Sequence, residues 1–133
     1  MIKYPYIKAE ISKSDHKLVL NVLNSQFLAQ GPMIKNFESA LSRRFKAKNS
    51  IVCSSGTSAL HLIYNSLGLN EKNGLLTTPI TFLATANAAR MCDAPVVFAD
   101  VDKNTGLLTA DTVDEALRKS KIPIKVICVV HLG

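Results

Sequence analysis

The sequence has no tryptophan and only three cysteines, Cys53, Cys92 and Cys128, in 133 residues. These thiols are far apart, odd in number and each set in an apolar run, so we expect reduced, buried cysteines rather than disulfides or a metal site. No apolar run approaches the roughly 20 residues of a membrane-spanning helix, and the first fifteen residues lack the apolar centre of a secretion signal. We therefore expect a cytoplasmic protein with no membrane partner.

Acidic residues are also few, with ten Asp and Glu against sixteen Lys and Arg and a formal net charge of +6. Such a charge could attract a nucleic acid or a phosphorylated small molecule. The basic residues are scattered, however, and the densest group, "RRFKAK" at 43–48, ends a predicted helix, where cations complement the helix dipole. We therefore expect no nucleic-acid partner.

Two helices are predicted in the first third of the chain. Residues 15–28 carry apolar side chains at helical spacing, with Ser14 or Asp15 as the N-cap, and a second helix covers residues 34–46. The Gly-Pro pair at 31–32 separates them because proline interrupts a helix.

From residue 50 onward, short apolar runs alternate with helical patterns. The runs read as continuously apolar, which is typical of parallel strands that are buried on both faces and joined by crossover helices. We therefore predict an α/β fold. The last strand stops where a loop and helix should follow, so we expect the chain to be truncated. The predicted strands are 50–54, 74–79, 94–101 and 124–130, and the predicted helices are 57–69, 82–92 and 109–120.

The stretch "SSGTSALHL" at 54–62 places three hydroxyl side chains and a glycine between a predicted strand and a predicted helix. Backbone N–H groups of a first helical turn, with Ser and Thr hydroxyls, bind phosphate well, and Gly56 permits close approach. Ser55 or Thr57 would serve equally well as a helix N-cap without any ligand. Neither a P-loop nor a GxGxxG motif is present, so both familiar nucleotide motifs are excluded.

A second stretch, "TTPITFLATANAARM" at 77–91, follows a predicted strand and brings Thr81 and Phe82 to the same edge of the sheet. An aromatic side chain there could stack on a planar ring whose phosphate is held by Gly56 and Thr57. For an isolated phenylalanine, packing in the core is the ordinary alternative.

Five stretches in one order resemble the DegT/DnrJ/EryC1/StrS aminotransferases, which are pyridoxal-phosphate enzymes acting on nucleotide-linked keto sugars. Within that family, the stretch at 77–91 is most similar to the aminotransferases of pseudaminic acid synthesis, which make a UDP-4-amino-4,6-dideoxy sugar. The five stretches are "FLAQGPMIKNFESAL", "SSGTSALHL", "TTPITFLATANAARM", "PVVFADVD" and "VVHLG".

The resemblance implies the first part of a fold-type-I large domain, with a mostly parallel sheet and flanking helices. Residues 1–48 would be an N-terminal helical segment, and residues 49–133 an incomplete pyridoxal-phosphate domain. It also implies a homodimer that binds a nucleotide-linked keto sugar and an amino donor, glutamate in the family. The residues implied for the cofactor are Ser55, Gly56, Thr57, Ser58 and Phe82, and those implied near the substrate are Gly31, Pro32 and His131.

No catalytic residue can be assigned in this chain. The chemistry needs a lysine that forms a Schiff base and a carboxylate that keeps the pyridine nitrogen protonated. In the family both follow the point where this sequence stops, and Lys121 and Lys125 flank a strand start remote from the ligand edge. We therefore expect an inactive fragment. The alternatives are a non-catalytic regulatory or assembly protein, and a pyridoxal-phosphate sugar dehydratase of the same family.

Overall fold

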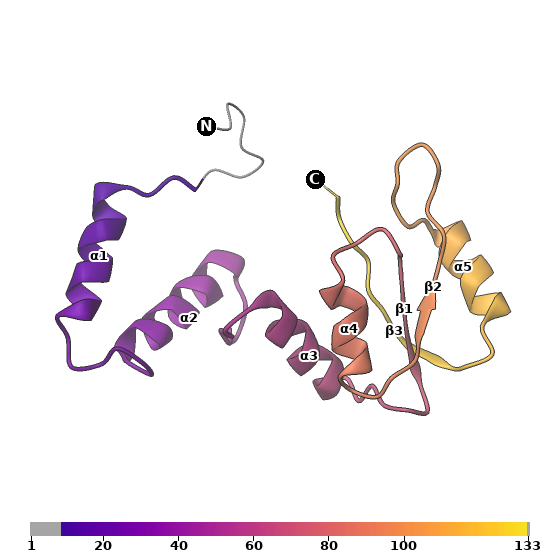
Figure 1. Ribbon diagram of the computed structural model, residues 1–133, viewed down its shortest axis with the longest axis horizontal. Helices are drawn as coiled ribbons and strands as arrows, with labels where there is room; N and C mark the ends of the chain where they lie inside the picture. Colours follow the sequence, from indigo (N-terminus) through magenta and orange to yellow (C-terminus); the bar gives the residue numbers. More distant parts are fainter. Residues whose placement is uncertain (1–8, 133) are drawn as a thin grey trace. The chain divides into compact units, whose positions relative to one another are not determined.

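The computed structural model describes residues 9–132, and the chain divides into two units with the boundary between Val52 and Cys53. Within the first unit, the described residues form helices α1 (Lys13–Leu23) and α2 (Pro32–Phe45) (Figure 1). The second unit contains α3 (Gly56–Ser66), β1 (Gly74–Thr77), α4 (Ala84–Arg90), β2 (Val96–Phe98), α5 (Ala110–Lys119) and β3 (Ile124–Ile127). Among the described residues, no helix is long and apolar enough to cross a membrane.

Helix α1 begins earlier and ends earlier than the sequence predicted. Its N-cap is Ser12, not Ser14 or Asp15: the Ser12 hydroxyl accepts the N–H of Asp15 at 3.2 Å, and the Asp15 carboxylate accepts the N–H of Ser12 at 2.8 Å. The Asp15 carboxylate accepts from the Ser12 backbone N–H and also from the Ser12 hydroxyl, and these two hydrogen bonds lower the pKa of Asp15. The helix stops at Leu23, because the Ser25 hydroxyl then donates to the Val22 carbonyl and turns the chain.

Helix α2 begins at the Gly-Pro pair, two residues before the start predicted at residue 34. Gly31 is the N-cap and Pro32 the first helical residue, a position where no N–H is needed and the fixed φ of proline fits. The helix ends where Lys46 adopts a left-handed conformation with φ of 53° and the Ala47 N–H donates to the Ser42 carbonyl. In the described part of this unit no residue is buried, so its apolar side chains form no closed core.

The second unit is built on three parallel strands in the order β2-β1-β3. Strand β1 lies in the centre and pairs with both neighbours, Leu75 with Val96 on one side and with Val126 on the other. This arrangement confirms the predicted α/β class and the parallel sheet. All of β1 is buried, whereas β2 and β3 are only partly buried, because each has one pairing neighbour among the described residues.

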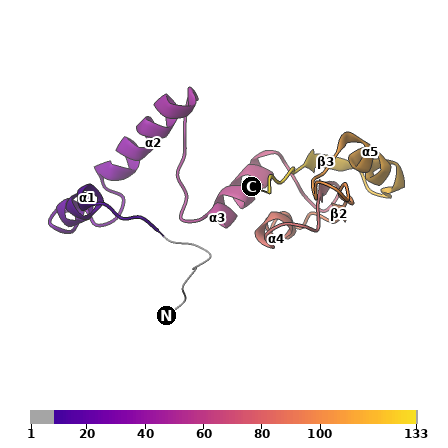
Figure 2. The same ribbon diagram turned by 90° about the horizontal axis from the view of Figure 1, so that it is seen from above.

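Helices cover both faces of the sheet, with α3 and α4 on one face and α5 on the other (Figure 2). Because successive side chains of a strand point to opposite faces, Leu75 packs in the cluster formed with α3 and α4, and Leu76 packs against Ala116 of α5. Ala88 and Ala89 are fully buried, and their small side chains let α4 approach the sheet closely. This packing fixes the ends of α3 and α4 relative to the strands.

The strand predicted at 50–54 is absent. The Val52 N–H donates to the Glu38 carboxylate at 3.1 Å, and Ile51 is 80% exposed. An apolar run becomes a strand only when another backbone pairs with it, and no strand of the described residues does so here.

Two other predictions also differ in detail from the structure. The helix predicted at 82–92 is shorter and spans Ala84–Arg90. The three cysteines are free and half-buried.

The central position of Leu75 predicts a large loss of stability on truncation. Leu75→Ala should lower the free energy of unfolding by about 2–5 kcal/mol, because it leaves a cavity between the sheet and α4. The control is Leu62→Ala, which removes the same atoms from a side chain that is 56% exposed on α3. Equal losses in urea unfolding would contradict a core centred on β1.

Candidate functional site

The turn before α3 is organised by its own hydroxyl groups. Ser55 is the N-cap, and its hydroxyl accepts the N–H of Ser58 at 3.1 Å. The hydroxyls of Ser54 and Ser55 lie 3.2 and 3.0 Å from that of Ser58. The capping role proposed for Ser55 is therefore real. It uses one of the free N–H groups at this helix end and leaves others available.

Gly56 and Thr57 are the first two residues of α3, and their N–H groups find no acceptor among the described residues. Gly56 is exposed, and a Cβ added to it would meet nothing within 4 Å. The protein's own packing therefore does not require a glycine here. Unpaired N–H groups at a helix start suit an anion, which the positive end of the helix dipole also favours.

Helices α3 and α4 are held together by the buried side chain of Tyr64, which is 2% exposed. Its hydroxyl donates to the Thr85 carbonyl at 3.3 Å, near the start of α4. Burial, with a smaller effect of the neighbouring Cys128, raises the pKa of Tyr64, so the hydroxyl remains a donor. We call residues 54–58 the serine turn and residues 78–83 the Phe82 loop. Helix α3, which begins in the serine turn, is therefore fixed against α4, which follows the Phe82 loop.

Two threonine contacts at the carboxyl edge of the sheet were not predicted from the sequence. The fully buried Thr77 donates its hydroxyl to the Cys128 carbonyl at 2.9 Å and so joins the ends of β1 and β3. The hydroxyl of Thr81, in the loop after β1, lies 3.0 Å from that of Thr85 in the first turn of α4. The available signal was the concentration of threonine directly after an apolar strand, where side chains reach the ligand edge of a parallel sheet.

Phe82 lies between β1 and α4 and is 80% exposed. The core-packing alternative is therefore wrong within the described structure, and most of the ring surface is accessible for stacking on a planar group. His131 follows β3, is also exposed and has no hydrogen-bond partner among the described residues.

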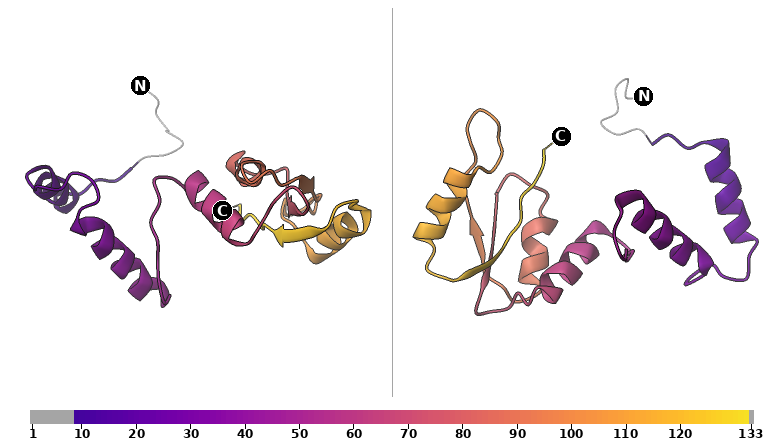
Figure 3. Two further views of the ribbon diagram at one scale, coloured as in Figure 1. Left: turned by 90° about the horizontal axis from the view of Figure 1, so that it is seen from below. Right: turned by 180° about the vertical axis from the view of Figure 1, so that it is seen from behind.

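The predicted residues of the second unit lie toward one end of it. The turn before α3, the Phe82 loop and the segment after β3 all lie toward the carboxyl ends of the strands (Figures 1 and 3). Gly31 and Pro32 belong to the first unit and are described there alone. A Cβ on Gly31 would lie 2.8 Å from the Phe27 Cβ, so close packing within that unit already explains this glycine.

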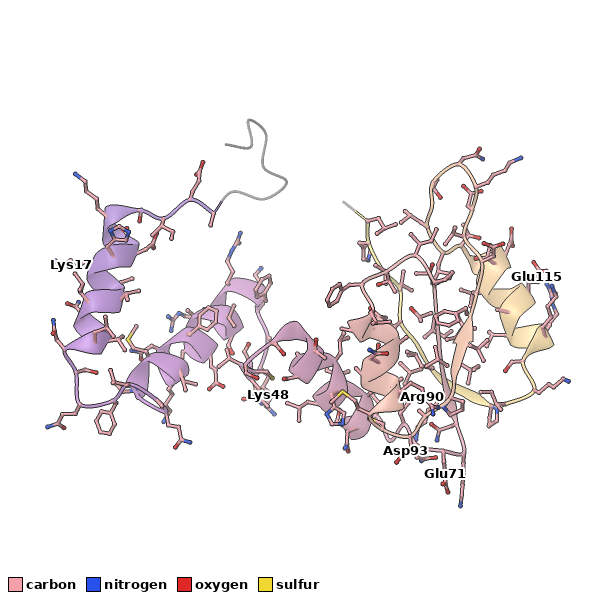
Figure 4. All side chains as sticks on the ribbon, in the orientation of Figure 1. Lys17, Lys48, Glu71, Arg90, Asp93 and Glu115 are labelled. Carbon is pink, nitrogen blue, oxygen red and sulfur yellow. The ribbon has the colours of Figure 1, made fainter. Side chains whose placement is uncertain are left out.

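The opposite end of the sheet has a different character. Glu71, Arg90 and Asp93 gather there (Figure 4), beside a cavity of about 340 Å³ that Glu71 and Asp93 help to line. Arg90, the last residue of α4, donates to the Ala94 carbonyl at 3.1 Å. Lys125 also points to this end, with its Nζ 3.4 Å from the Gly68 carbonyl. It lies far from the serine turn and cannot act there.

Comparison with known proteins identifies the family. Residues 9–133 match the model of the DegT/DnrJ/EryC1/StrS aminotransferase family, and the chain belongs to that family. The chain spans about a third of the length of the curated relatives it matches.

Two relatives are similar in sequence over nearly the whole chain. A Campylobacter jejuni protein named UDP-4-amino-4,6-dideoxy-N-acetyl-beta-L-altrosamine transaminase is 40% identical over 128 residues, covering 96% of this chain and 34% of the relative. The solved structure of Helicobacter pylori PseC, an aminotransferase involved in pseudaminic acid biosynthesis, is 34% identical with a TM-score of 0.84. That match covers 95% of this chain and 33% of PseC.

A third protein shares the fold at lower identity. The structure of a GDP-4-keto-6-deoxymannose-3-dehydratase with a trapped PLP-glutamate geminal diamine is 24% identical, with a TM-score of 0.83. The match covers 98% of this chain and 34% of the dehydratase. The same fold therefore occurs in aminotransferases and in a dehydratase.

The Thr77 hydrogen bond can be tested by removing its donor. Thr77→Val should cost about 1–3 kcal/mol of stability, because the Cys128 carbonyl loses a buried partner. It should also speed hydrogen exchange at the Cys128 N–H, which pairs with Leu76. Thr77→Ser keeps the hydroxyl and should keep the slow exchange. If the two variants exchanged equally fast, the hydroxyl would not join the strand ends.

Proposed function

We propose that this chain is the amino-terminal part of a pyridoxal-phosphate-dependent sugar aminotransferase. The enzyme would transfer an amino group from glutamate to the 4-keto carbon of a UDP-linked 6-deoxy sugar, for amino-sugar or cell-surface glycan synthesis. Family membership and the names of the two similar relatives support the reaction and the substrate class. The observation that carries the cofactor assignment is the serine turn, with an exposed glycine and two unpartnered N–H groups.

The residues of the second unit fit this cofactor. The N–H groups of Gly56 and Thr57 would hold its phosphate, and the hydroxyls of Ser55 and Ser58 would keep the turn in shape. The exposed Phe82 ring would cover one face of the pyridine ring. When bound, the cofactor would carry the amino group between the donor and the sugar.

The remaining assignments concern the substrate and the assembly. Gly31, Pro32 and His131 would lie near the sugar, in an active site completed by a second copy of the chain. Residues 1–48 would form the helical segment and residues 49–133 the first part of the cofactor domain. We place the enzyme in the cytoplasm, where nucleotide sugars are made.

The 133-residue chain itself would not turn over substrate. Lys121 and Lys125 lie away from the serine turn, and the Schiff-base lysine and the pyridine carboxylate would follow Gly133.

The dehydratase of similar fold supports a second candidate, a sugar dehydratase that uses the same cofactor and has no lysine at that position. A non-catalytic protein is the third candidate. The coding sequence downstream of Gly133 separates them: a lysine favours the aminotransferase, its replacement the dehydratase, and a stop codon the non-catalytic role.

The proposed reaction can be followed with isotope-labelled donor. The protein extended by its downstream coding sequence should transfer ¹⁵N from glutamate to a UDP-4-keto-6-deoxy sugar, as seen by mass spectrometry. The 133-residue chain, assayed in parallel, should transfer none. Loss of the sugar hydroxyl without ¹⁵N incorporation would indicate the dehydratase instead. ¹⁵N-labelled product from the 133-residue chain would refute the proposal that the Schiff-base lysine and the pyridine carboxylate follow Gly133.

A substitution of Gly56 should affect cofactor binding and protein stability differently. Gly56→Ala should leave stability unchanged or raise it by at most about 1 kcal/mol, because the added Cβ meets open space and alanine favours a helix. The same Cβ would obstruct the phosphate, so the Kd of the extended protein for pyridoxamine phosphate should rise about tenfold. An unchanged Kd, measured by isothermal titration calorimetry, would place the phosphate elsewhere.

A further inference from the structure

A cavity of about 390 Å³ lies in the first unit, between α2 and the segment that follows it. The left-handed turn at Lys46 reverses the chain, so that Lys48 and Ser50 lie back along the helix. Figure 4 shows Lys48 in this segment. The Ser42 hydroxyl donates to that of Ser50 at 3.0 Å and holds the two walls together. The cavity is therefore formed by hydrogen-bonded structure and not by a loose loop.

Positive charge dominates the lining of this cavity. Lys35, Arg43 and Lys48 contribute three positive charges, and Glu38 contributes one negative charge, which leaves a net +2. The Glu38 carboxylate already accepts the N–H of Val52. Within residues 9–132, none of the three cations forms an ion pair. The three cations therefore line the cavity without an ion-pair partner among the described residues.

The helix dipole does not explain this cluster. Cations in the last turn of a helix are stabilised by the dipole, which accounts for Arg43 and Arg44. Lys35 lies one turn from the amino end of α2, where a positive charge is unfavourable, and that turn contains no acidic residue. Lys48 lies beyond the helix. The meeting of Lys35 and Lys48 with Arg43 around one cavity needs another cause.

We propose that this cavity binds a phosphate or pyrophosphate group, separately from the serine turn of the second unit. A net charge of +2 matches a phosphate dianion, and a guanidinium with two ammonium groups provides charge-assisted donors. The hydroxyls of Ser39 and Ser50 and the amide of Asn49 offer further donors in the lining. The site does not depend on the proposed transaminase function, because it uses no residue of the cofactor turn.

The test is a titration of the ¹⁵N-labelled 133-residue chain with inorganic phosphate, and in a second arm with pyrophosphate, at low ionic strength. We expect saturable shifts of the backbone amides of Ser42 and residues 48–50. Tighter binding of pyrophosphate would indicate a diphosphate ligand, and equal affinity a single phosphate. Shifts confined to residues 55–58, or no saturable shift with either probe, would overturn the proposal.

Two neighbouring arginines provide a matched pair of variants. Arg43→Gln removes a cation from the cavity lining and should weaken phosphate binding about tenfold. Arg44→Gln makes the same charge change one residue away, outside the lining, and should change the affinity less than about twofold, as expected for a screened surface charge. Equal effects of the two substitutions would mean general electrostatic attraction and would refute a site.

Lys35→Gln tests whether weaker phosphate binding comes from the loss of a cation or from unfolding of α2. Removing a cation near the amino end of α2 should not destabilise the helix, so circular dichroism should be unchanged while phosphate binding weakens. If Lys35→Gln bound phosphate as tightly as the unmodified chain, Lys35 would not belong to the site and the proposal would fail. Binding of a long oligonucleotide but of neither phosphate probe would equally contradict it.

Discussion

Parallel pairing of β1 with both β2 and β3 is the constraint on which the second unit depends. It buries all four residues of β1 and obliges the chain to return along a helix before each following strand. Helices α4 and α5 lie on opposite faces because Leu75 and Leu76 point to opposite faces. The carboxyl ends of the strands, and with them the Phe82 loop and the segment after β3, consequently share one end of the sheet.

At that end, the same residues serve the fold and the candidate site. Ser55 caps α3 through the N–H of Ser58 and leaves the N–H groups of Gly56 and Thr57 free. A helix cap and a phosphate turn are therefore compatible, because they use different donors of one helix end. Tyr64 then anchors α3 to the start of α4 through its buried hydroxyl. A phosphate position and an aromatic ring position can thus be held within one packed unit.

Local signals predicted much of this unit from the sequence. The alternation of apolar runs and helical patterns predicted the parallel sheet, and Ser55, one of the two cap candidates named from the sequence, caps α3. Long-range pairing decided the rest. The apolar run at 50–54 forms no strand because no described backbone pairs with it, and the exposure of Phe82 depends on how the loop after β1 folds. Neither is encoded in nearby residues.

The central claim, that the serine turn binds the cofactor phosphate, is tested most directly by locating bound pyridoxamine phosphate on the ¹⁵N-labelled chain. The amide protons of Gly56 and Thr57 should move downfield and saturate, because their N–H groups gain a charged acceptor. Pyridoxamine, which has the same ring and no phosphate, should leave them in place. Unmoved amides with both compounds, or equal shifts with both, would contradict the account.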